Sequence, residues 1–169
     1  FPDVKSLKKF KMNYIDKTDD FFPYKRDEKT LARKWAIPGV KGLEHRIGGL
    51  EKEDGTGNVS YDPDNHHNMT HKRQEKVDII SNFIPDAEVY GEKKGKLRVL
   101  GWGGTYGSIK SAVSRAQVEG LSVSQLHLKY INPFPKNLGE LLLKYDKILI
   151  PELNMGQLLA ISRAKYLVD

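Results

Sequence analysis

The sequence predicts an α/β fold with three layers, in which a mainly parallel sheet lies between helices, preceded by a long irregular arm. Two observations carry this prediction. Residues 97–169 alternate short apolar runs with amphipathic stretches, as right-handed crossovers onto a parallel sheet do. Residues 1–70 are instead rich in Gly, Pro, Asp, Asn and aromatic residues, and they show no sustained period of 3.6 or 2.0 residues.

The arm, residues 1–70, is expected to contain one or two short strands. So much irregular chain is unusual inside a self-contained domain, so we expect the arm to pack on other domains of a larger subunit. Residues 54–58 and 62–65 resemble calcium or diphosphate-magnesium loops only faintly, because the alternation of ligands is incomplete. We interpret both segments as turns.

A helix is predicted over residues 71–84. Its apolar residues Val77, Ile80 and Ile84 are spaced to line one face, and Pro85 ends it. We interpret it as the linking helix of an α/β domain that covers residues 71–169.

The remaining part of that domain, residues 96–169, is predicted to be a Rossmann-like unit. Strands are expected over residues 97–102, 123–128 and 147–150, and helices over residues 105–119, 138–145 and from about residue 155. Four residues of the first of these helices are expected to face inward: Ile109, Ala112, Val113 and Ala116. Gly120 should end that helix.

The last helix carries a predicted capping box, with Asn154 as the cap and Gln157 three residues later. Residues 165–169 form another apolar run with no terminating signal behind it. We therefore expect the native chain to continue past Asp169.

Composition argues against several classes of protein. The 169 residues include no cysteine, so this chain has no ligands for an iron–sulfur cluster or a thiolate zinc site. No window approaches the roughly 18 apolar residues of a membrane span, and no signal peptide opens the sequence, so we expect a cytoplasmic protein. The net charge of +6 is spread along the chain, and basic and aromatic residues do not interleave on a strand, which disfavours nucleic-acid binding.

A glycine-rich turn, residues 101–107 (GWGGTYG), follows the first predicted strand and opens a helix. Free amides at such a place can hold a phosphate. The spacing differs from the dinucleotide fingerprint, however, and no acidic residue ends the second strand. We favour a tight turn or a contact with a neighbouring domain, and the candidates for cofactor binding or an interface here are Gly103, Gly104, Thr105 and Tyr106.

The ends of the other two strands supply four more such candidates: Asn132, Pro133, Glu152 and Asn154. Ligands and partners gather at the carboxyl ends of parallel strands, although both segments could equally be plain loops. His67 and His71 are four residues apart, but no Glu follows His67, so no metal site is predicted.

Three of these segments together resemble one family. Residues 101–107, 132–139 (NPFPKNLG) and 151–158 (PELNMGQL) are similar to the C-terminal module of the alpha subunit of 2-oxoacid:ferredoxin oxidoreductases, most closely the 2-oxoglutarate type. Residues 48–53 and 58–63 resemble the arm before that module. Gly104, where a small hydroxyl residue is expected, and Met155, where Leu is commoner, depart from the pattern.

The resemblance implies a fold like the transketolase C-terminal domain and an enzyme of the EC 1.2.7 type. Such an enzyme decarboxylates a 2-oxoacid on thiamine diphosphate, passes electrons through iron–sulfur clusters to ferredoxin, and transfers the acyl group to coenzyme A. The implied partners are a beta subunit, which mainly holds the magnesium and diphosphate, and the remaining alpha-subunit domains. This chain would be a structural and interfacial fragment that binds no cofactor and is inactive alone.

Within that resemblance, the catalytic candidates are Glu44 and His45, which could offer a carboxylate and an imidazole near the active-site channel. The competing hypothesis is a stand-alone α/β module that binds an anion or nucleotide at the turn of residues 103–107. The module should bind a phosphate-bearing ligand by itself, whereas an enzyme fragment should bind little and expose an apolar interface.

Overall fold

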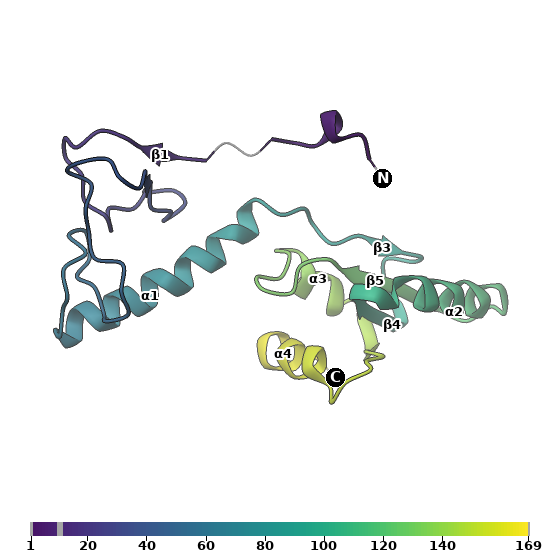
Figure 1. Cartoon of the computed structure of the whole chain (residues 1–169). Helices are drawn as coiled ribbons and strands as arrows, with labels where there is room; N and C mark the ends of the chain where they lie inside the picture. The colour runs from purple at the N-terminus through teal and green to yellow at the C-terminus, as the bar shows by residue number, and fades with distance from the viewer. Residues whose placement is uncertain (1, 10–11, 169) are drawn as a thin grey trace. The chain divides into compact units, whose positions relative to one another are not determined.

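The structure is a computed structural model that describes residues 2–9 and 12–168, and the chain divides into two compact units, Phe1–Ile79 and Ile80–Asp169 (Figure 1). The sequence placed the boundary near residue 70, before the linking helix, whereas that helix belongs to the first unit. Within the described residues, none of the helices has the length and apolar character of a membrane span.

The first unit contains little regular structure before its long helix. It has a short 3₁₀ turn, η1 (Val4–Ser6), and two strands of two residues, β1 (Tyr14–Ile15) and β2 (Trp35–Ala36), which pair in parallel. The long helix is α1 (Pro63–Ile79). Leu43 and Met69 are the only buried apolar side chains among its described residues, so this unit has a very small core of its own.

Helix α1 begins at Pro63, well before the predicted start at residue 71. The side chain of Asp62 accepts a hydrogen bond from the amide of Asn65 at 2.7 Å, as a helix cap does. Pro63 has no amide to leave unsatisfied at the first helical position. The interpretation of residues 62–65 as a plain turn was therefore wrong. The predicted apolar face also fails, because Ile80 lies beyond α1 and is 44% exposed.

The second unit contains a four-stranded sheet in the order β3-β5-β4-β6. The strands are β3 (Val89–Tyr90), β4 (Gly95–Trp102), β5 (Val123–Leu128) and β6 (Tyr145–Leu149). Strand β4 pairs in parallel with β5 and β6, whereas β3 is an antiparallel edge strand. The predicted mainly parallel sheet is confirmed, and the prediction for residues 123–128 matches β5 at both ends.

Helices cover both faces of this sheet and complete the three predicted layers. One buried cluster joins α2 (Tyr106–Val118) to the sheet and consists of Val99, Ile109, Val113 and Val123. The other joins α3 (Leu138–Leu142) and α4 (Gln157–Tyr166) to the sheet and includes Leu100, Leu126, Leu138 and Leu158. Val99 and Leu100 are neighbours in β4, so they point to opposite faces and separate the two clusters. Figure 1 shows α2 running beside β4 and β5.

Helix α2 confirms one local prediction and contradicts another. Gly120 ends α2 as predicted, with a φ of +83° and hydrogen bonds from Gly120 N to Gln117 O and from Leu121 N to Ala116 O. The prediction that Ala112 faces inward was wrong, because the buried stripe of α2 runs through Ile109 and Val113 and leaves Ala112 exposed.

The start of α4 differs from the predicted capping box. Gln157 is the first residue of α4, whereas a capping box needs Gln at the third helical position. Its side chain is therefore not placed to bond the backbone amide of Asn154. The side-chain oxygen of Asn154 instead accepts from the amides of Gly156 and Gln157 at 2.8 and 3.0 Å. The next two amides, those of Leu158 and Leu159, donate to the carboxylate of Glu152. Glu152 and Asn154 therefore cap this helix together.

Candidate functional site

The predicted candidates of the second unit gather at one edge of its sheet. Because β4, β5 and β6 are parallel, their carboxyl ends lie on the same side. The chain leaves β4 through α2 to β5 on one side, then returns through α3 to β6 on the other side of β4. In sheets of this kind, ligands bind at such a reversal of strand order, beyond the carboxyl ends of the two strands that flank it, here β4 and the edge strand β6.

The turn after β4 forms one side of this edge. Gly103–Thr105 is a 3₁₀ turn, η3, in which Gly103 has a φ of +59° and the Thr105 hydroxyl donates to the carbonyl of Trp102 at 2.8 Å. A β-carbon on Gly101 would collide with the side chain of Ile109. The glycines therefore allow α2 to approach β4 closely, while Gly103 and Gly104 leave their surface exposed.

Glu152 and Asn154 lie on the other side of this edge, after β6. Partial burial favours the neutral form of Glu152, but the amides of Leu158 and Leu159 and the side chains of Asn154 and Trp102 outweigh it. The pKa of the Glu152 carboxyl is therefore lowered. The contact with Trp102, the last residue of β4, joins the segment after β6 to the end of β4. An ionised carboxylate thus lies at the N-terminus of α4, where the helix dipole stabilises it.

Asn132 and Pro133 follow β5, but only one of them faces solvent. Asn132 is exposed, whereas Pro133 and the following Phe134 are buried, and Phe134 belongs to the core cluster beneath α3 and α4. The Asn132–Pro133 peptide bond is cis. Asn137, at the end of the same loop, exchanges two hydrogen bonds of 2.9 Å with the backbone of Ala87. The loop is therefore anchored into the fold.

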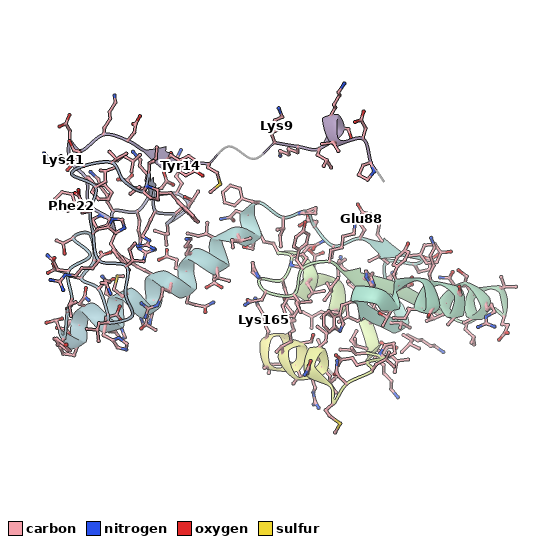
Figure 2. The ribbon with its side chains drawn as sticks, in the orientation of Figure 1. Lys9, Tyr14, Phe22, Lys41, Glu88 and Lys165 are labelled. Atoms are coloured by element: carbon pink, nitrogen blue, oxygen red, sulfur yellow. The ribbon has the colours of Figure 1, made fainter. Side chains whose placement is uncertain are left out.

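A cavity of about 510 Å³ beside β3 and β5 contains residues that the sequence analysis did not select. Its lining consists of Glu88, Val89, Tyr90, Tyr106, Gln125, His127 and Lys129. Figure 2 shows Glu88 on the segment that leads into β3. Of the candidates predicted from the sequence, Tyr106 lines this cavity. Gln125 and His127 are two residues apart in a strand, so their side chains point to the same face, and this spacing could have identified them as neighbours.

His127 is the titratable group of the cavity whose environment is most distinctive. Its ring lies edge-on to Tyr106 with centroids 5.1 Å apart, and its Nδ1 is buried without a hydrogen-bond partner. Burial lowers the pKa of His127, the charge of Lys129 lowers it further, and a hydrogen bond with the backbone of Gly103 opposes both. The neutral imidazole is therefore the favoured form near pH 7.

Glu44 and His45 belong to the first unit and line a separate cavity of about 620 Å³. The carboxylate of Glu44 accepts from the amide of Gly42 at 2.7 Å, and Nδ1 of His45 lies 2.8 Å from the carbonyl oxygen of Leu43. The His45 ring also packs edge-on against Phe21 at 5.5 Å. Both side chains are thus held by local contacts, and both remain exposed to solvent.

His67 and His71 both lie on α1, with ring centroids 4.1 Å apart. Nδ1 of His71 is 2.9 Å from the carbonyl oxygen of His67. In the part of the chain that the structure describes, no group of three or more His, Asp or Glu side chains is arranged to hold a metal ion.

Comparisons with known proteins all lead to one group of enzymes. The chain is 50% identical over 99% of its length to 2-oxoglutarate oxidoreductase subunit KorA of Mycobacterium tuberculosis strain H37Rv, of which it covers 26%. It is 27% identical over 93% of its length to subunit alpha of 2-oxoacid:ferredoxin oxidoreductase 1 of Aeropyrum pernix, of which it covers 25%. No protein-family model matches the chain.

A solved structure is similar as well. It is a 2-oxoglutarate:ferredoxin oxidoreductase from Magnetococcus marinus with 2-oxoglutarate, coenzyme A and succinyl-CoA bound. The TM-score is 0.87 at 28% identity, and the match covers 99% of this chain and 29% of that one. The chain thus spans about a quarter of the length of the curated relatives it matches.

Proposed function

Because this chain is homologous along its length to a segment of the alpha subunits of 2-oxoacid:ferredoxin oxidoreductases, we propose that it is part of such an alpha subunit. The whole enzyme would convert 2-oxoglutarate to an acyl-coenzyme A with ferredoxin as electron acceptor, in the cytoplasm. The observation that carries this proposal is the 50% identity over 99% of the chain to a 2-oxoglutarate oxidoreductase subunit.

The cofactors of the reaction are assigned to other parts of the enzyme. Thiamine diphosphate, when bound, supplies the electron-accepting chemistry that lets a 2-oxoacid lose carbon dioxide. The 169 residues include no cysteine to hold an iron–sulfur cluster. The described residues also present no cluster of acidic or imidazole ligands for magnesium. A beta subunit and the remaining alpha-subunit domains are the proposed holders of these groups.

This segment itself is proposed to be structural and interfacial. Large apolar side chains remain exposed in both units, among them Ile47 at 86% and Tyr61 at 85% in the first unit. In the second unit, Leu153 and Met155 are 100% and 99% exposed at the carboxyl edge of the sheet, each next to a capping residue of α4. Isolated soluble proteins seldom leave such side chains grouped in solvent, which supports contacts with the rest of the enzyme there.

The candidate residues take different roles in this proposal. Gly103–Thr105, Glu152 and Asn154 shape the carboxyl edge, and the exposed Asn132 extends it, so a partner domain that docks there would contact all of them. Glu44 and His45 are proposed to lie near the substrate channel, because each presents a polar group at the 620 Å³ cavity. Replacing His45 with Ala in the intact enzyme should then change kcat or KM, whereas the exposed His71→Ala serves as the matched control.

The activity is tested with the full-length alpha subunit co-expressed with its beta subunit and purified without oxygen. We expect reduction of a viologen dye that depends on coenzyme A and prefers 2-oxoglutarate to pyruvate. No turnover of any 2-oxoacid by an intact, cluster-loaded complex would contradict the enzyme hypothesis. The alternative, a stand-alone anion-binding module, then predicts that the isolated chain binds a nucleotide at residues 103–107.

A further inference from the structure

A strongly basic groove of about 440 Å³ lies in the first unit, among residues 24–33, residues 48–52 and helix α1. Five basic side chains and one acidic side chain line it: Arg26, Arg33, Lys52, Arg73, Lys76 and Glu51. Tyr24, Leu50 and Met69 supply its apolar surface. The groove lies entirely within one compact unit, so its geometry does not depend on the second unit.

The acidic groups near this groove are already engaged. Glu51 contacts Nη1 of Arg73 at 3.2 Å and Nδ1 of His66 at 2.7 Å. Asp54, whose charge also reaches Arg26, forms its ion pair with Lys72. Lys52 is buried and donates to the carbonyl oxygens of Gly48 and Leu50.

Three cations of the groove therefore lack a counter-ion. Arg26, Arg33 and Lys76 form no ion pair within the described ranges of the chain. An unpaired cation in a partly enclosed space attracts an anion, since the surrounding protein screens the field less than water does.

The fold holds two of these cations close together. A backbone bridge pairs Arg26 with Arg33, Nη1 of Arg26 donates to the carbonyl of Leu31 at 3.1 Å, and the Arg33 guanidinium stacks 4.1 Å from the centre of the Tyr24 ring. Burial, followed by the charge of Arg33, lowers the pKa of Arg26. Nε of Arg26 is buried and has no hydrogen-bond partner. Both guanidinium groups thus retain donors for an anion, which would also relieve their repulsion.

We propose that this groove binds a phosphate group of a phosphorylated small molecule, with Arg26 and Arg33 as its guanidinium ligands and Lys76 as a third cation. Paired guanidinium groups match the geometry and the double charge of a phosphate. A single carboxylate would neutralise only one of the three free cations. The groove is larger than a phosphate group, so its apolar surface is available to the remainder of the ligand. This inference does not depend on the proposed reaction.

The test uses the full-length alpha–beta complex, loaded with its cofactors, in titration calorimetry with inorganic diphosphate, ADP and coenzyme A as separate probes. Binding of diphosphate identifies a free phosphate source, whereas binding of ADP or coenzyme A alone identifies a nucleotide-linked one. Arg33→Gln and Lys76→Gln should each weaken the binding at least about tenfold, the usual effect of losing a hydrogen bond to a charged group. Arg115→Gln, an exposed arginine of α2 outside the groove, should bind like the wild type.

Lys76→Gln keeps the test valid if Arg33→Gln disturbs the fold, because the Lys76 side chain is exposed and forms no hydrogen bond or ion pair within the described residues. Hydrogen exchange should also slow in residues 24–33 and 48–52 when the probe binds. The proposal is overturned if no probe binds, or if one binds with equal affinity to the wild type and both variants. Dye reduction by 2-oxoglutarate is measured separately, so failure here leaves the proposed reaction untouched.

Discussion

The guanidinium carbon of Arg98 lies 3.9 Å from the centre of the Tyr145 ring, on the face of β4 that also carries Leu100. Arg98 is fully buried, and its three nitrogens have no hydrogen-bond partner within the described residues. Burial lowers the pKa of Arg98, and the nearby Tyr145 only partly offsets this. The aromatic ring therefore replaces only part of the hydration that this cation gives up.

Arg98→Met should stabilise the protein, because it removes a buried charge and keeps a similar volume. We expect a gain of about 1–3 kcal/mol in the free energy of unfolding, measured by urea denaturation. The exposed Arg115→Met should change this free energy by less than about 0.5 kcal/mol. A large loss of stability in Arg98→Met would show that Arg98 has an acceptor that the described residues do not supply.

The pKa of His127 should lie below the ordinary histidine value of about 6.5, because burial disfavours the imidazolium. The contribution of His127 to the free energy of unfolding is then fully present above the pKa that this histidine has in the unfolded chain. It is lost as the pH falls below that value, because the unfolded chain then binds the proton more readily. NMR titration of the imidazole protons, assigned with His127→Gln, measures this pKa. Lys129→Gln should raise it by removing a like charge, and an unchanged value would contradict that cause.

Glu152→Ala should destabilise the second unit by about 1 kcal/mol, since the amides of Leu158 and Leu159 lose their capping acceptor. Because the folded pKa of Glu152 is lowered, this contribution is present at neutral pH and is lost as the pH falls through that pKa. Thermal unfolding at pH 7 and pH 4 should show a smaller difference at the lower pH. Glu140→Gln, an exposed partner of Lys144, should change the melting temperature much less.

Gly139→Ala should destabilise the protein although alanine is the better helix former. An added β-carbon would lie 2.8 Å from the ring of Tyr166, which is packed against Phe134, so the ring would have to move. In α2, by contrast, a β-carbon on Gly107 meets nothing within 4 Å, so Gly107→Ala should stabilise by up to about 1 kcal/mol. Chemical denaturation of both variants checks the pair, and equal effects would contradict the steric explanation.

The alternation of strands and helices after residue 95 was predictable because each signal there is local. The apolar run that became β5 and the glycine that ends α2 depend on residues close together in the sequence. The same segments carried the family resemblance, which the comparisons with known alpha subunits confirm.

The predictions of how helices α1 and α4 begin were wrong, because each start depends on side-chain hydrogen bonds that the spacing of apolar residues does not reveal. The early start of α1 depends on the cap supplied by Asp62, and its first turn is tied to a distant loop, where Asn65 bonds the backbone of Lys52 and Asp54. The start of α4 depends on Glu152, five residues before the helix, together with Asn154, rather than on the predicted pair of Asn154 and Gln157. Polar side chains can satisfy helix ends from several positions, so the sequence alone did not decide between them.

The sequence by itself determined the fold class, the parallel core strands and the family that the segment resembles, because these follow from periodicity and from short motifs. Only the tertiary structure decided which side chains meet. It placed Arg26 beside Arg33, His127 beside Tyr106 and Arg98 against Tyr145. Their burial and charge depend on folded neighbours, and in two of these pairs the partners lie more than 20 positions apart along the chain.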